Sequence, residues 1–285
     1  MPEQEVIHVV IGAGGMGVAS ARRLGGNVLL ADMDEERLAV ACEELRGECA
    51  TIESVRCDVT SRDSVTQLAE RVKATTLPLG ARVNFAGIGA SPGSDCRQMM
   101  NVNLIGTVLV LDAFEPIATG HSVGICVSSV GGHRDFTKAF DDLLSDPLAP
   151  DFMERLEARL VLDENEVAVY AVSKRGVILQ VEMRAKAWGK RRARLVSLSP
   201  GHIADTVMGS TLNPDQSPYV KLSALGQPGE AEELGAIVGL LASPGGTYIT
   251  GCDILADGGA LATIENHLPE NERAAWHRAN TRLTA

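Results

Sequence analysis

Residues 6–17 read VIHVVIGAGGMG, an apolar run that leads into a cluster of glycines. The run has the length and β-branched content of a buried strand, and helix-forming residues follow it at 16–25. Gly12 would permit a tight turn, Gly14 the close approach of a pyrophosphate, and Gly17 the close packing of helix on strand. Because a helix N-terminus attracts anions, the stretch predicts a turn that binds the phosphates of a dinucleotide.

The next predicted strand, residues 27–32, ends in Asp32, at the distance from the glycines where a dinucleotide site places an acidic residue. A carboxylate there accepts from both hydroxyls of the adenosine ribose and repels a 2′-phosphate, so the sequence predicts NAD and makes NADP the less favoured cofactor. Three arginines keep a partner for a 2′-phosphate possible: Arg22, Arg23 and Arg37. Further contacts with the dinucleotide are expected from Gly15, Met16 and Met33.

Strand and helix patterns alternate along the rest of the chain. Predicted strands occupy residues 6–11, 27–32, 54–59, 81–87, 122–129, 193–200 and 253–258. Predicted helices occupy residues 16–25, 34–47, 61–74, 95–118, 168–189 and 230–242. This alternation predicts an α/β fold, a single Rossmann-type, doubly wound domain over residues 1–285. Its parallel seven-stranded sheet is expected to be flanked by helices, with a tail at 260–285.

Composition narrows the classes of partner. The net charge of −11 argues against nucleic acid and anionic membrane surfaces, because phosphate contact needs clustered Lys and Arg. The N-terminus lacks the features of a signal peptide, and we expect no membrane-spanning run. The six cysteines form no C-x-x-C pair, and Cys57, Cys126 and Cys252 lie in or beside predicted strands. We therefore expect buried free thiols, no catalytic metal and a cytoplasmic protein.

A catalytic pair is indicated by the stretch VYAVSKRG, in which Tyr170 and Lys174 are four residues apart on one helix face. An ammonium close to a phenol favours the phenolate, so Lys174 is expected to lower the pKa of Tyr170 toward the working range. Ser128 and Ser129 follow the strand at 122–129, at the sheet edge where open α/β sheets bind ligands. A serine hydroxyl there could hold a substrate oxygen while Tyr170 supplies or removes its proton.

With these motifs the chain resembles the short-chain dehydrogenase/reductase family over nearly its whole length. The stretches that carry the resemblance, in order, are CDV, NFAG, MNVNLIGT, SS, YAVSK, LSPGHIADT and ITGCDILADGG. The resemblance implies a catalytic set of Asn103, Ser129, Tyr170 and Lys174. It also implies cofactor contacts by Asp58, Val59, Asn84, Ala86, Gly87, Tyr170, Lys174, Pro200, Gly201, Ile203 and Thr206.

The resemblance also implies a mechanism. Tyr170 would exchange a proton with the substrate oxygen while the nicotinamide exchanges a hydride with the substrate carbon. Lys174 would hold the nicotinamide ribose, Ser129 would fix the substrate oxygen, and Asn103 would position a water that links Lys174 to solvent. The implied partners are a small alcohol or ketone and further copies of the chain. A homodimer or homotetramer would form through the helices near 95–118 and 168–189.

Two features depart from the family pattern. The glycine turn has the spacing G-x-G-x-x-G, with Ile11 where the family has Thr or Ser. The interval from Ser129 to Tyr170 is much longer than in the family, and residues 131–169 predict a helical insertion with two short amphipathic helices, the second opened by a capping box at Asp151 and Glu154. We expect a cover over the substrate pocket; the alternative is a helical pair packed on the outside or at a subunit contact.

The leading functional hypothesis is an NAD(H)-dependent oxidoreductase that interconverts a secondary alcohol and a ketone. A non-catalytic NAD-sensing or scaffold protein on the same fold is the alternative, although it would be expected to lose the tyrosine or lysine. A sugar-nucleotide epimerase would need a larger C-terminal domain, and an enoyl reductase a different Tyr–Lys spacing. The substrate is expected to be largely apolar, with Arg134 and Lys138 as possible partners for a substrate carboxylate. His133 is read as a polar loop residue, and His202 as a possible cofactor contact.

Overall fold

A computed structural model describes residues 5–162, 165–206 and 217–278 of the chain. Its strands are β1 (Ile7–Ile11), β2 (Asn27–Asp32), β3 (Thr51–Arg56), β4 (Leu79–Asn84), β5 (Val123–Val127), β6 (Arg194–Pro200) and β7 (Asp253–Ala256). They form one sheet in the order β3-β2-β1-β4-β5-β6-β7, and each neighbouring pair is parallel. The predicted seven-stranded, doubly wound Rossmann-type sheet is therefore confirmed.

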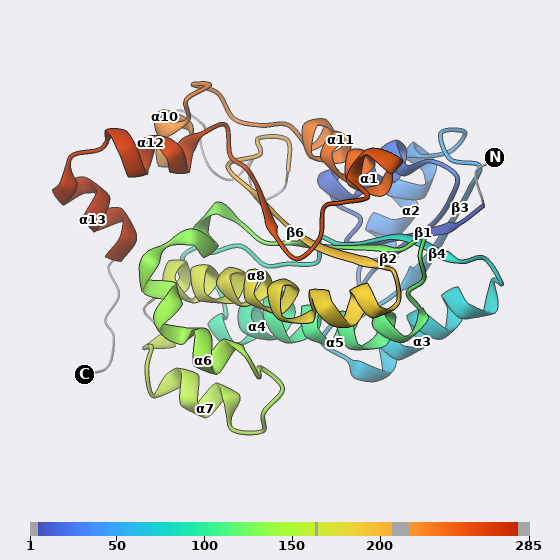
Figure 1. Cartoon of the computed structure of the whole chain (residues 1–285), viewed down its shortest axis with the longest axis horizontal. Helices are drawn as coiled ribbons and strands as arrows, with labels where there is room; N and C mark the ends of the chain where they lie inside the picture. Colours follow the sequence, from blue (N-terminus) through green and yellow to red (C-terminus); the bar gives the residue numbers. More distant parts are fainter. Residues whose placement is uncertain (1–4, 163–164, 207–216, 279–285) are drawn as a thin grey trace.

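Helices cover both faces of this sheet (Figure 1). On one face lie α1 (Gly15–Leu24), α2 (Glu35–Glu44) and α11 (Ala231–Ala242). On the other lie α3 (Arg62–Ala74), α4 (Cys96–Met100), α5 (Thr107–Phe114) and α8 (Glu166–Lys190). The six helices expected from the apolar periodicity are all present. The five central strands are buried because the helices of the parallel crossovers cover both faces, whereas the edge strands β3 and β7 are partly or largely exposed.

The order of the strands creates the crevice in which a ligand can bind. The chain moves outward from β1 to β2 and β3, and then returns to place β4 on the other side of β1. The loops after β1 and β4 therefore leave the sheet edge in opposite directions, which opens a crevice beyond the carboxyl ends of these strands. The glycine turn at residues 12–17 lies at this crevice.

The predicted helix at 95–118 is continuous but changes its pitch. After α4 comes a π-helical turn, Asn101–Gly106, followed by α5 and a short 3₁₀ turn, Glu115–Ile117. The span Cys96–Ile117 has the length and hydropathy of a membrane helix, although we expected no such run. In this fold it packs against α3 and α8, and its apolar side chains belong to two buried clusters of the core.

The insertion at 131–169 contains two 3₁₀ turns, Val130–His133 and Asp135–Phe140, and then α6 (Asp141–Leu144) and α7 (Phe152–Glu157). Its apolar side chains join those of α4 and α8 in one buried cluster, with Phe140, Leu143, Leu144, Phe152 and Leu156 from the insertion. Figure 1 shows α6 and α7 on the outer side of α4 and α8. Residues 141–157 therefore pack on the outside, as the alternative interpretation had it, and not over the site.

Three local expectations fail. The predicted capping box is absent, because Asp151 precedes α7 without a hydrogen bond from its side chain to the helix. Cys252 is exposed, whereas Cys57 and Cys126 are buried as expected, since Cys252 precedes the edge strand β7 and lacks a covering neighbour. The presumed tail is helical as far as residue 278, with α12 (Ala260–His267) and α13 (Glu270–Arg278). Together with α10 (Pro218–Leu222), these helices lie at one end of the molecule (Figure 1).

Candidate active site

The glycine turn has the backbone that its sequence requires. Gly12 has a φ of +100°, and a Cβ atom there would lie 3.0 Å from the backbone nitrogen of Ala86. A Cβ on Gly17 would lie 1.9 Å from the carbonyl oxygen of Gly12, so only glycine lets α1 approach β1 this closely. Gly14 precedes α1 and faces open space, with no atom within 4 Å of its Cβ direction. The turn thus leaves room for a ligand at the amino end of α1.

Asp32 lies beside this turn at the end of β2, where its side chain is buried. Oδ2 accepts a hydrogen bond of 2.8 Å from the backbone N–H of Ala13, and Oδ1 accepts one of 3.0 Å from that of Asp34. Both oxygens lie 3.3 Å from Nη1 of Arg37. These contacts fix the carboxylate next to the turn, where the sequence placed it, with the exposed Met33 as its neighbour.

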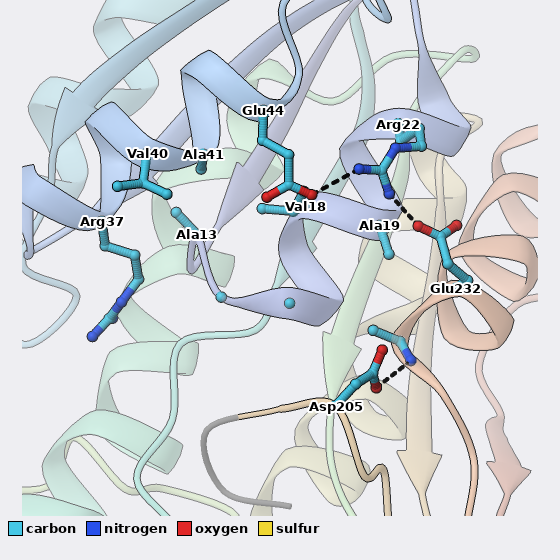
Figure 2. Close-up of a pocket in the computed structure, with 13 residues that line it drawn as sticks. Ala13, Val18, Ala19, Arg22, Arg37, Val40, Ala41, Glu44, Asp205 and Glu232 are labelled. Atoms are coloured by element: carbon cyan, nitrogen blue, oxygen red, sulfur yellow. Dashed lines mark hydrogen bonds and ion pairs between the residues drawn. The ribbon is translucent and has the colours of Figure 1, made fainter. Parts of the chain in front are cut away.

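A pocket of about 320 Å³ lies between the glycine turn, α1, α2 and α11 (Figure 2). Arg37 and Arg22 stand at opposite ends of it. Arg22 is held by three carboxylates, at 2.8 Å from Glu44, at 2.6 Å from Glu48, and in contact with Glu232. Its charge is therefore already compensated. Arg23 is exposed and lies 3.7 Å from Glu232, so Arg37 alone of the three stands beside Asp32.

The residues after β3 and β4 reach the same edge of the sheet. Asp58 accepts hydrogen bonds from the N–H and the hydroxyl of Thr60, and Val59 is buried against Gly106. Asn84 donates to the hydroxyl of Thr107 at 3.0 Å and accepts from the N–H of Ala86 at 3.3 Å. This amide therefore ties β4 to α5, which is a structural role.

Ser129 and Tyr170 are brought together across the 41 residues that separate them in the chain. The Ser129 hydroxyl is close enough to Tyr170 to affect its pKa, and Oγ of Ser129 accepts a hydrogen bond of 3.2 Å from the backbone N–H of Gly131. A Cβ atom on Gly131 would lie 3.6 Å from both Oγ of Ser129 and Cε1 of Tyr170. Burial raises the pKa of Tyr170 to about 12; the Ser129 hydroxyl opposes this shift and nearby Tyr219 adds to it.

Lys174 lies one helical turn beyond Tyr170, but its ammonium does not contact the phenol. Nζ donates to the carbonyl oxygen of Val127 at 3.0 Å and lies 5.7 Å from the centre of the Tyr170 ring. Burial lowers the pKa of Lys174 to about 8. The expected lowering of the Tyr170 pKa is therefore wrong for this structure, because removal of the phenol from water outweighs the distant charge.

Asn103 is fully buried in the π-helical turn. Its Oδ1 accepts from the N–H of Ile88 at 2.7 Å, and its Nδ2 donates to the carbonyl of Ile88 at 2.9 Å and to the hydroxyl of Ser173 at 3.1 Å. Gly87 lies between the two polar groups, since a Cβ there would be 3.3 Å from Asn103 Oδ1 and 3.4 Å from Lys174 Nζ. Asn103 and Lys174 thus converge on the loop that follows β4.

The segment after β6 completes the edge. Pro200 is buried, and Gly201 has no space for a side chain because a Cβ would lie 2.8 Å from Cα of Asp257. Ile203 is buried and pairs with Gly229, and the Thr206 hydroxyl donates to the carbonyl of Ile203 at 3.0 Å. These residues lie where the sequence predicted a nicotinamide contact. A second pocket, of about 180 Å³, lies beside them and is lined by His202 and by Tyr219 of α10.

Tyr219 was not expected from the sequence, because it belongs to no motif and becomes relevant only through its position near Tyr170. His133 makes a hydrogen bond of 2.9 Å with Asp253, as befits a polar structural residue. Nε2 of His202 is buried and has no hydrogen-bond partner in the described chain. The described residues contain no group of three metal-ligating side chains.

The arrangement fits a dinucleotide. Open space at Gly14 lies next to the amino end of a ten-residue helix, and a fixed carboxylate stands beside it. Farther along the same edge, Lys174 and the pair of Ser129 and Tyr170 surround the loop after β4 and the segment after β5. A nicotinamide cofactor bound there would supply the hydride acceptor or donor, which the side chains themselves lack.

Comparisons with known proteins agree with this geometry. Residues 5–139 match the family model described as short chain dehydrogenase, and residues 153–260 match the model described as enoyl-(acyl carrier protein) reductase. The short-chain dehydrogenase/reductase bsc3 of Alternaria brassicicola is 31% identical over 268 residues, which cover 90% of this chain and 96% of the relative. The NADH-dependent L-xylulose reductase of Ambrosiozyma monospora is 28% identical over 89% of this chain and 94% of its own.

A solved structure has the same fold. The short chain dehydrogenase from Burkholderia cenocepacia, in complex with NADP, superposes with a TM-score of 0.73 at 22% identity, over 90% of this chain and 98% of that one.

Proposed function

Because the chain belongs to the short-chain dehydrogenase/reductase family and is therefore an NAD(P)-linked oxidoreductase of CH–OH groups, we propose that it interconverts a secondary alcohol and a ketone with NAD(H). The observation that carries this proposal is the convergence of Ser129 and Tyr170 on Gly131, where a Cβ atom would lie 3.6 Å from both side chains, with Lys174 one helical turn away. The three side chains have distinct tasks.

Tyr170 holds the proton that moves. Because its pKa is about 12, the phenol is protonated at neutral pH and can donate to the oxygen of a ketone as it becomes an alcohol. Ser129 would face the same substrate oxygen, since its Oγ and the Tyr170 ring lie against the same residue, Gly131. In the oxidative direction Tyr170 must first lose its proton, because only the phenolate can take the proton from the alcohol.

Lys174 and Asn103 support this transfer. The ammonium of Lys174 places a positive charge near the phenol and is free to turn from the Val127 carbonyl toward ribose hydroxyls at the loop after β4. Asn103 fixes that loop through Ile88 and contacts Ser173, which neighbours Lys174. We assign both residues to the catalytic machinery, Asn103 as a positioning residue.

The preference for NAD rests on Asp32. Its carboxylate is fixed by two backbone N–H groups and would accept from the ribose hydroxyls, whereas a 2′-phosphate would bring a second negative charge beside it. The NADH dependence in the name of the xylulose reductase supports this preference. Arg37, 3.3 Å from Asp32, is the feature that favours NADP.

The non-catalytic alternative has weaker support. A sensor or scaffold protein needs the dinucleotide site but has no use for a serine and a tyrosine that converge beside it. Incubation of the protein with NADH or NADPH and a panel of secondary alcohols and ketones, followed by absorbance of the reduced cofactor, separates the two. Turnover of at least one pair with NADH supports the oxidoreductase; cofactor binding without turnover supports the sensor.

We further propose a cytoplasmic homodimer or homotetramer. Free cysteines support a reducing compartment, and exposed apolar side chains on α8 and α11 support contact between copies. Val167 and Met183 are exposed on α8, and Leu240 on α11. Light scattering coupled to gel filtration tests the assembly, and fluorescence microscopy of the tagged protein tests the location.

A further inference from the structure

One arginine beside the proposed site pairs with no carboxylate among the described residues. Arg134 lies five residues after Ser129, in a protein whose net charge is −11. Among the described residues, its side chain donates a hydrogen bond from Nη2 to the hydroxyl of Tyr219, at 3.2 Å. The nearest acidic residue in the chain, Asp135, is occupied by Lys138 at 2.9 Å and by His277 at 3.3 Å.

The guanidinium of Arg134 is held in place by aromatic groups. Its Cζ atom lies 5.0 Å from the ring centre of Trp276, on α13. Within the described ranges, the buried Nε of Arg134 has no hydrogen-bond partner, and neither has the buried Nε1 of Trp276. Buried polar groups in proteins are nearly always paired, so a cluster of unpaired donors marks a place where a partner is missing.

This cluster lies next to the reacting groups. Tyr219, which receives the hydrogen bond from Arg134, is close enough to Tyr170 to affect its pKa. Gly131, which neighbours both Ser129 and Tyr170, accepts a backbone hydrogen bond from the N–H of Arg134. The positive charge is therefore tied to the segment that carries the serine.

We propose that Arg134 recognises a carboxylate on the substrate, so that the alcohol oxidised at Tyr170 is a hydroxy acid and its product a keto acid. This inference rests on the proposed function. A planar guanidinium with free donors binds a carboxylate through two parallel hydrogen bonds, which both compensates its charge and orients the ligand. Tyr219 and Trp276 hold the guanidinium in a fixed orientation before the substrate arrives.

The test uses matched pairs of compounds that differ only in charge: 3-hydroxybutyrate and 4-hydroxypentanoate against their methyl esters, each with NAD. The wild-type protein is expected to prefer the acids. Arg134→Met is expected to lower kcat/KM for the acids roughly 10- to 100-fold, mainly through KM, and to leave the esters unchanged. Arg134→Lys is expected to retain part of the preference.

Lys138, the other cation that the sequence offered for a substrate carboxylate, is exposed and already paired with Asp135 at 2.9 Å, so Lys138→Met is the matched control for the loss of one positive charge. It is expected to change neither acid nor ester more than about twofold, since an exposed charge is screened. The inference is overturned if the wild type treats acids and esters alike. It is also overturned if Arg134→Met impairs both equally, which would make Arg134 a structural link to α13.

A binding measurement separates this inference from the proposed function. Acetoacetate, added to the protein with NAD, which cannot reduce it, is expected to change the tryptophan fluorescence through Trp276, and Arg134→Met is expected to abolish that change. Binding through Arg134 without turnover of any compound would retain the anion site and overturn the oxidoreductase. Turnover of the esters without binding of acetoacetate would support the oxidoreductase and overturn the anion site at Arg134.

Discussion

The ammonium of Lys174 lies 5.7 Å from the ring centre of Tyr170 and donates to the carbonyl oxygen of Val127. Because both side chains are removed from water, the pKa of Tyr170 is raised to about 12 and that of Lys174 is lowered to about 8. Between these two values the phenol is protonated while the lysine is neutral. Tyr170 can therefore donate a proton at every pH below 12, and Lys174 carries a positive charge only below about pH 8.

This relationship predicts the pH dependence of ketone reduction. A lysine with a lowered pKa is charged below that pKa and loses its charge as pH rises through it, so kcat/KM for reduction should fall above about pH 8. Lys174→Arg should remove this decline in whatever activity remains, because a guanidinium stays charged. Lys186→Arg, at an exposed position on the same helix, should retain it. An identical decline in Lys174→Arg would contradict the assignment.

Cofactor preference should depend on Asp32. Asp32→Ala removes the acceptor for the ribose hydroxyls, so affinity for NADH should fall roughly 10- to 100-fold while affinity for NADPH stays equal or improves. Asp34→Asn is the control. It removes a negative charge two residues from Asp32, but it keeps a side-chain oxygen that can accept the hydrogen bond at the start of α2. Titration of each variant with both reduced cofactors gives the ratio. A parallel loss for the two cofactors would refute the role of Asp32.

The buried Arg82 should reduce stability. It is fully buried on β4, where Nη1 and Nη2 lie 3.6 Å and 3.7 Å from the sulfur of Cys126 and the guanidinium lies over Trp188. No carboxylate among the described residues compensates its charge. Arg82→Met should therefore raise the free energy of unfolding by about 1–4 kcal/mol, and Arg82→Lys should not. Denaturant unfolding monitors both, and a loss of stability in Arg82→Met would show that the charge is compensated.

The insertion should contribute to stability and not to substrate access. Phe152 is buried in the cluster shared by α4, α7 and α8, so Phe152→Ala should lower the free energy of unfolding by about 3–5 kcal/mol. The same cluster also packs against Tyr170, so the test of KM uses Phe152→Leu, which keeps an apolar side chain there and should leave KM unchanged. Phe152→Leu should lower the free energy of unfolding by less than Phe152→Ala does. If a Phe152 variant had normal stability but an altered KM, the insertion would instead act as a cover over the substrate pocket.

The sequence predicted those parts of the site that depend on local spacing. Tyr170 and Lys174 are one helical turn apart, and Gly12 and Asp32 follow neighbouring strands, so periodicity alone brought them to one edge. The position of Arg134 depends instead on contacts with Tyr219 and Trp276, from segments far away in the chain. The spacing of apolar residues in the insertion at 131–169 shows that its helices have a buried face. It does not show against which part of the protein that face packs.

The central claim is that Tyr170 transfers the proton that accompanies oxidation or reduction of the substrate. Tyr170→Phe keeps the ring and removes only the hydroxyl, and Ser129→Ala serves as a second variant that removes the neighbouring serine hydroxyl. The decisive measurement is single-turnover absorbance of NADH in Tyr170→Phe, with NADH affinity determined in the same sample. We predict near-normal NADH affinity and turnover reduced to background; turnover at the wild-type rate would contradict the account.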